Sequence, residues 1–116
     1  MAPLSVQAEE AKHMLDANTL DNVQKVAPAL EKYAQGPLAD LWRRPGLALR
    51  DRSIVTLAAM VARNQTVDMA GQLDRALDNG IKPAEISEII THLAFYAGWP
   101  NAVTAVGIAR EVFQKK

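Results

Sequence analysis

His92 and Tyr96 stand four residues apart in the segment THLAFYAGWP, residues 91–100, and Glu85 and Glu88 precede them. On a helix, these four side chains lie along one stripe. A carboxylate, an imidazole and a phenol on one stripe can transfer protons, because histidine titrates near neutral pH. The same pattern is typical of a surface Glu–His pair with Tyr96 packed beside the core, and the spacing alone leaves both interpretations open.

A second polar stripe is expected on the helix that follows Thr66, at Asp68, Gln72, Arg75 and Asn79. A solvated helix face is the default interpretation of such a stripe. The opposite side of this helix is apolar and carries Met69, Leu73, Ala76 and Leu77.

Arginines bracket the apolar segment SIVTLAAMVA, residues 53–62, at Arg43, Arg44, Arg50, Arg52 and Arg63. Arginine is the preferred side chain for bidentate binding of a carboxylate. Arg52 and Arg63 are eleven residues apart, so on a helix they lie on the same side, about three turns apart. Arg52, together with Arg44 or Arg63, is therefore a candidate for binding a carboxylate, although Arg52 could equally pair with a nearby acid.

Composition excludes several classes of function. The thirteen basic and thirteen acidic residues balance without a basic run, which argues against a nucleic-acid partner. There is no cysteine, so thiol redox chemistry and thiolate metal sites are excluded. His13 and His92 are far apart and form no metal-binding pattern, and no Gly-rich phosphate loop or Gly-x-Ser-x-Gly motif occurs. We therefore expect neither a metal nor a cofactor.

The compartment is predicted from what the chain lacks. The N-terminus, MAPLSVQAEEAKHML, has no apolar run behind a basic start. No segment approaches the roughly 20 apolar residues that cross a bilayer. These features predict a cytoplasmic protein without a membrane partner.

The pattern of apolar residues and breakers predicts an all-α fold in a single domain over residues 1–116, with residues 1–19 as a peripheral N-terminal helical region. Thr66 is the expected N-cap of a helix that ends at Gly80. Pro37, Pro83 and Pro100 are expected in first turns. Helices are predicted at about 6–17, 20–34, 37–44, 50–63, 67–79, 83–98 and from 100 onward.

The segment at 50–63 is apolar on nearly every side, and a helix of this kind must be buried all round. A chain of 116 residues leaves much of its apolar surface uncovered. We therefore expect a homo-oligomer.

Two segments together resemble the carboxymuconolactone decarboxylase family of the alkylhydroperoxidase D-like superfamily: LWRRPGLALRDRSIVTLAAMVARNQ and LDRALDNGIKPAEISEIITHLAFYAGWPNAVTAVGIAREVF. The resemblance covers about residues 20–116. It implies an all-helical bundle whose core helix pair is shared between subunits, in an obligate trimer or hexamer.

The resemblance also bears on the chemistry. The peroxidase branch of the superfamily uses a Cys-x-x-Cys pair, whose positions correspond to Gln65 and Asp68, so that dithiol route is impossible here. The decarboxylase-like branch commonly has an acid and a histidine one turn apart, and these positions correspond to Asp68 and Gln72. Glutamine can orient a substrate by hydrogen bonds but cannot exchange a proton at neutral pH.

The resemblance implies decarboxylation or proton transfer on a small cyclic carboxylated metabolite. In that role, Arg52 with Arg44 or Arg63 would bind carboxylate, and Asp68 and Gln72 would orient the substrate. His92 would supply the proton, and Tyr96 would position His92. The alternative is a non-catalytic ligand-binding or scaffold oligomer, because the same fold supports many functions.

Overall fold

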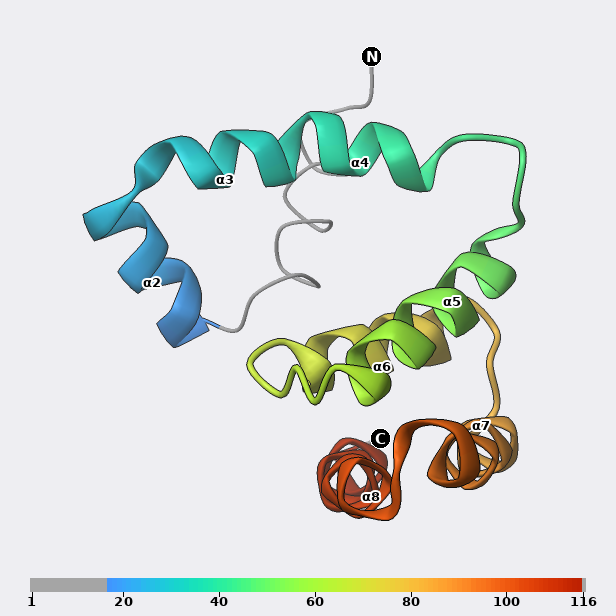
Figure 1. The fold of residues 1–116 in the computed structure, drawn as a ribbon. Helices are drawn as coiled ribbons and strands as arrows, with labels where there is room; N and C mark the ends of the chain where they lie inside the picture. Colours follow the sequence, from blue (N-terminus) through green and yellow to red (C-terminus); the bar gives the residue numbers. More distant parts are fainter. Residues whose placement is uncertain (1–16, 116) are drawn as a thin grey trace. The chain divides into compact units, whose positions relative to one another are not determined.

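The computed structural model describes residues 17–115, and these form seven α-helices and no strand. The predicted all-α class is confirmed (Figure 1). No helix in this part of the chain is long and apolar enough to span a membrane. The helix predicted at 6–17 and His13 lie outside the described residues. The helices are α2 Ala17–Val26, α3 Pro28–Gln35, α4 Pro37–Trp42, α5 Leu49–Ala62, α6 Met69–Asp78, α7 Pro83–Ala97 and α8 Trp99–Gln114.

The chain divides between Ala48 and Leu49 into two compact units. The single domain expected over residues 1–116 therefore stays a prediction. Within the described residues, α2 to α4 belong to the first unit and α5 to α8 to the second.

The one helix predicted at 20–34 is wrong, because the chain breaks into α2 and α3 at Ala27. A proline ring disfavours helical geometry in the residue before it. Ala27 precedes Pro28 and has φ −144° and ψ 68°. Its N–H still bonds the carbonyl of Val23 at 2.8 Å, which closes the last turn of α2. Pro28 then begins α3, as Pro37 begins α4.

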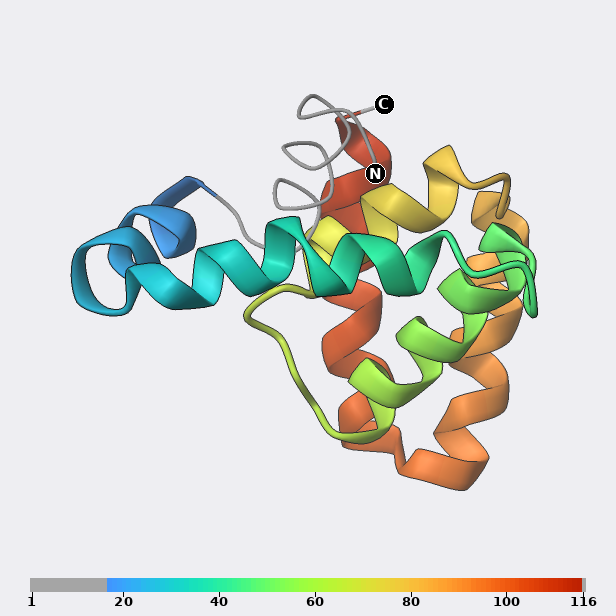
Figure 2. The same cartoon turned by 90° about the horizontal axis from the view of Figure 1, so that it is seen from above.

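The second unit is a four-helix bundle. Its packed pairs are α5–α6, α5–α7, α6–α8 and α7–α8, with a smaller contact between α5 and α8. These pairs place α6 and α7 on one diagonal of the bundle. Figure 2 shows α7 and α8 side by side and antiparallel, joined by the turn at Gly98.

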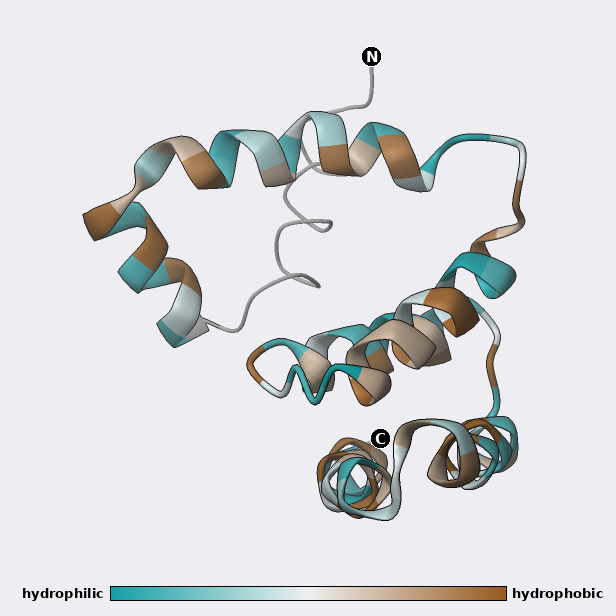
Figure 3. Cartoon of the chain, viewed as in Figure 1, coloured by the Kyte–Doolittle hydropathy of each residue, from teal (hydrophilic) through white to brown (hydrophobic). Residues whose placement is uncertain are grey.

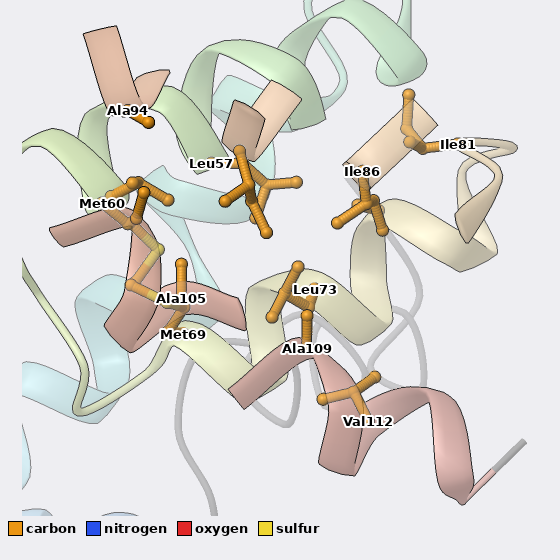
Figure 4. Packing of buried hydrophobic residues seen from close by; sticks show 14 residues of the cluster. Leu57, Met60, Met69, Leu73, Ile81, Ile86, Ala94, Ala105, Ala109 and Val112 are labelled. Carbon is orange, nitrogen blue, oxygen red and sulfur yellow. The ribbon is translucent and has the colours of Figure 1, made fainter. Parts of the chain in front are cut away.

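The core of this bundle combines large side chains from α5 to α7 with small ones from α8. Leu57, Met69 and Ile86 are at most 2% exposed, and the cluster around them is drawn in Figure 4. Ala105 and Ala109 are buried on α8, where their small side chains allow close helix packing. Apolar positions recur along all four helices in Figure 3, and the apolar side predicted for α6 is confirmed.

Helix ends follow local sequence signals, with one exception. Gly80 and Gly98 have φ of 96° and 99°, a region that glycine enters without a steric penalty. The N-cap predicted at Thr66 is wrong, because α6 begins at Met69 and Asp68 occupies the capping position. Thr66 takes part in this helix start through its backbone carbonyl, which accepts a hydrogen bond from the backbone N–H of Met69 at 3.3 Å.

Two glycine substitutions should change stability in opposite directions. Gly80→Ala forces a Cβ into left-handed backbone and should lower the free energy of unfolding by about 1–2 kcal/mol. Gly107→Ala lies inside α8, where an added Cβ meets nothing within 4 Å, and should raise it by about 0.5–1 kcal/mol. Urea denaturation measures both variants. Equal effects of the same sign would contradict the assigned backbone geometry.

Candidate functional site

The polar face of α6 is buried, although the sequence favoured a solvated one. Gln72 is 3% exposed, and its Nε2 donates to Oδ2 of Asp68 at 3.1 Å. Asp68 is half-buried at the capping position of α6, one turn before Gln72. The two residues that the family resemblance singled out therefore form one hydrogen-bonded pair.

Arg75 lies one turn beyond Gln72 on the same face and is also 3% exposed. Burial lowers the pKa of its guanidinium to about 10, because desolvation disfavours the charged form. Perturbed groups of this kind concentrate at functional sites. Sequence reasoning did not select Arg75 as a site residue. The available signal was its position on the stripe of Asp68 and Gln72.

The last turn of α6 is fixed against the first turn of α5. Asn79 Nδ2 donates to Ser53 Oγ at 2.9 Å, and Ser53 Oγ donates to the carbonyl of Leu49 at 3.0 Å. Ser53 is buried. This contact brings the turn of α5 that carries Arg52 beside the turn of α6 that carries Arg75. Arg52 and Arg75 therefore belong to turns that lie at the same end of the α5–α6 pair.

Four other arginines, two in each unit, were candidates for the same role. Arg63 is exposed beyond the end of α5. Its eleven-residue separation from Arg52 spans about 16 Å of helix. Arg44 is exposed after α4, in the first unit. Arg50 forms an ion pair with Glu85, and Arg43 forms one with Asp40.

His92 lies in a different place, a groove between α5 and α7 with a volume of about 370 Å³. Its lining is Ile54, Ala58, Glu88, Ile89, His92 and Leu93. The His92 ring stacks on Tyr96 with 4.8 Å between centroids, and Tyr96 itself is 80% exposed. Glu85, which the sequence placed on the same stripe, does not line this groove. Its carboxylate forms an ion pair with Arg50 and accepts a hydrogen bond from the backbone N–H of Lys82.

The candidate residues therefore separate into two locations. Asp68, Gln72 and Arg75 share the buried face of α6, whereas His92 shares a groove to which α6 contributes no lining residue. Because α6 and α7 are diagonal in the bundle, the four side chains do not converge on one reacting atom within the described bundle.

Comparison with known proteins identifies the class. The model of the carboxymuconolactone decarboxylase family matches residues 27–111, and the chain belongs to this family.

Two relatives are both named as decarboxylases. The chain is 34% identical over 85 residues to 4-carboxymuconolactone decarboxylase of Acinetobacter baylyi, a match that covers 73% of this chain and 61% of the relative. It is 26% identical over 105 residues to nitrosuccinic acid decarboxylase npaB of Metarhizium robertsii, covering 86% of this chain and 73% of the relative. The chain thus spans less than two thirds of the first relative's length.

Arg75→Met should lower the free energy of unfolding by about 2–4 kcal/mol, because it removes a buried guanidinium from the groups that interact with it. Arg75→Lys keeps a positive charge at this position and should lower the free energy of unfolding less. Urea denaturation of the two variants measures the difference. A gain in stability in Arg75→Met would instead mean that the cost of desolvating the guanidinium exceeds the interactions that it makes.

Proposed function

We propose that this chain is a decarboxylase of a small dicarboxylic acid that carries its own electron-accepting group. Family membership and the names of both relatives support decarboxylation. Those names denote dicarboxylic acids with an unsaturated lactone in one case and a nitro group in the other. The observation that carries the proposal is the buried face of α6, where Asp68 and Gln72 adjoin the desolvated cation of Arg75.

The reaction breaks one bond from carbon to carboxylate and releases carbon dioxide. The bonding electron pair stays on the substrate and moves into the lactone carbonyl or the nitro group, and a proton is added to carbon afterwards. Because the substrate accepts the pair, the step needs no added electron-accepting group. A dry site favours loss of carbon dioxide, since removing water destabilises a carboxylate more than the spread charge that replaces it.

Each residue of the α6 face has a role in this proposal. Arg75 binds the carboxylate that remains, and Arg52 extends the cationic end of the site, because guanidinium groups match carboxylates in geometry and charge. Asp68 fixes the amide of Gln72 through their hydrogen bond. The second N–H of that amide can donate to the oxygen on which negative charge develops.

The proton is assigned to solvent water. Gln72 cannot supply it, and the His92 groove has no lining residue from α6. A nitronate or a conjugated enolate is stabilised enough to take its proton from water after carbon dioxide has left. His92 and Tyr96, which the sequence suggested as the acid and its positioning residue, act only if substrate occupies the α5–α7 groove.

The second candidate function is binding without catalysis. It is favoured by Gln72, which stands where the resemblance gives a histidine. Saturable binding of both acids with no release of carbon dioxide would support this function. Appearance of turnover in Gln72→His would then identify a site that has lost its acid.

Purified full-length protein should release carbon dioxide from 4-carboxymuconolactone, nitrosuccinate or both. Arg75→Met should lower kcat/KM by about 100-fold, because a desolvated charged hydrogen bond is worth about 2–4 kcal/mol. Arg43→Met is the matched control, since Arg43 is exposed and pairs with Asp40, and it should keep full activity. Unchanged turnover in Arg75→Met would remove Arg75 from the site.

His92→Gln should retain turnover within about threefold, since the proposed site does not include this imidazole. The same assay with Glu88→Gln controls for a change of charge in the groove. A loss of 100-fold or more, typical of a missing general acid, with unchanged circular dichroism, would place the substrate in the α5–α7 groove instead.

A further inference from the structure

Helix α6 is followed by the only Asn-Gly dipeptide in the sequence, Asn79-Gly80, whose own atoms can react with each other. The backbone nitrogen of Gly80 can attack Cγ of the Asn79 side chain and close an imide ring. The bond from Cγ to Nδ2 breaks, and Nδ2 leaves as ammonia with the amide proton of Gly80. Water then opens the ring at either carbonyl and gives aspartate or isoaspartate. Glycine favours this attack, because it has no Cβ to hinder the approach.

The folded backbone keeps the two reacting atoms apart. Asn79 has φ −87° and ψ 8°, so the Gly80 nitrogen lies beside the backbone nitrogen of Asn79 and is turned away from its Cβ. Ring closure requires the Gly80 nitrogen to turn toward that Cβ. The N–H of Gly80 also donates to the carbonyl of Leu77 at 3.1 Å. The N–H of Ile81 donates to the carbonyl of Ala76 at 2.9 Å. This pair of bonds closes the end of the helix, and the reaction requires it to open.

The Asn79 side chain is held by α5. Its Nδ2 donates to Ser53 Oγ at 2.9 Å, and the Ser53 hydroxyl donates to the carbonyl of Leu49 at 3.0 Å. Ser53 is 2% exposed, so solvent does not compete for its hydroxyl. The backbone N–H of Asn79 donates to the carbonyl of Arg75 at 2.9 Å. The amide that must rotate toward Gly80 is therefore fixed by two helices.

We propose that Asn79 is a site of spontaneous deamidation and that the Ser53 hydroxyl is the contact that keeps it unmodified in the folded chain. The reaction proceeds from a locally open form, in which the end of α6 has left α5. Its rate follows the population of that form, as for other processes that require local unfolding. This inference is independent of the proposed function, since the reaction consumes only water.

Deamidation weakens the contact that prevents it. The product has a carboxylate in place of the amide, so the donor to Ser53 Oγ is lost. When the Ser53 hydroxyl donates to this carboxylate, the carbonyl of Leu49 loses its side-chain donor. A negative charge at the C-terminus of α6 also opposes the helix dipole. Each modified chain therefore has a weaker contact between α5 and α6, and the loss of ammonia makes the change irreversible.

Ageing of the full-length protein at mildly alkaline pH tests the proposal, with peptide mapping that separates asparagine, aspartate and isoaspartate at position 79. The folded protein should deamidate about tenfold or more slowly than protein unfolded in urea, because the closed turn must first open. Ser53→Ala should speed the folded reaction about fivefold, the factor that one ordinary hydrogen bond contributes. Thr56→Ala is the matched control and should retain the wild-type rate. Thr56 is also on α5, and its hydroxyl donates to the carbonyl of Arg52 at 2.8 Å rather than holding Asn79.

Two results would overturn the proposal. Equal rates in folded and urea-unfolded protein would mean that the fold does not protect Asn79. Equal rates in Ser53→Ala and Thr56→Ala would remove Ser53 from its role. Ser53→Cys, which has a similar size and a weaker hydrogen-bonding group, should react at a rate between those of the wild type and Ser53→Ala. It provides the same test if Ser53→Ala does not fold, and circular dichroism measures the folding of each variant.

The consequence of the modification has a separate readout. Asn79→Asp carries the carboxylate of one product and should unfold at a lower urea concentration than the wild type. An unchanged midpoint would show that the contact between α5 and α6 tolerates the carboxylate, and would overturn this consequence.

Discussion

Helix α6 must bury both of its faces, and the candidate site depends on this constraint. Met69 and Leu73 face the core of the bundle and are at most 3% exposed, while Gln72 and Arg75 on the polar side are equally buried. Removing a guanidinium from water disfavours its charge, and the lowered pKa of Arg75 reflects that cost. The apolar packing of α6 on α5 and α8 offsets the cost. A stable core is thus the condition for keeping a guanidinium buried on the polar side of α6.

Much of the fold could be predicted because its signals are local. Pro83 begins α7 and Gly98 follows its last residue. Both residues act through their own backbone dihedral angles, so their effect does not depend on contacts distant in the sequence. The break at Ala27 was equally local, but the apolar spacing across it resembled one continuous helix. Thr66 has the right side chain for a cap, yet α6 begins two residues later than that cap would require.

The site was harder to predict, because the spacing of residues on a helix indicates which side chains share a side of it. It does not indicate whether those side chains are buried or how far they lie from side chains of other helices. Arg52 lies in the first turn of α5 and Arg63 follows its last residue, so the two arginines are separated by nearly the whole helix despite the predicted shared side. The residues of the predicted α7 stripe make separate contacts: Glu85 forms an ion pair with Arg50, whereas His92 lines the α5–α7 groove. Burial of Arg75 arises from tertiary packing, which no periodicity in α6 encodes. The family resemblance located Asp68 and Gln72 where spacing alone favoured a solvated surface.

Gln72 limits the substrates that the proposed chemistry can serve. An enzyme with an acid at this position can protonate a poorly stabilised carbanion as it forms, whereas an amide can only stabilise charge by donating hydrogen bonds. The carbanion must then persist until water protonates it, which requires an electron-accepting group directly conjugated to the carbon that loses its carboxylate. A nitro group meets this requirement most fully. Under the proposed mechanism, Gln72 therefore favours the nitro acid over the lactone among acids of the two kinds that the relatives' names denote.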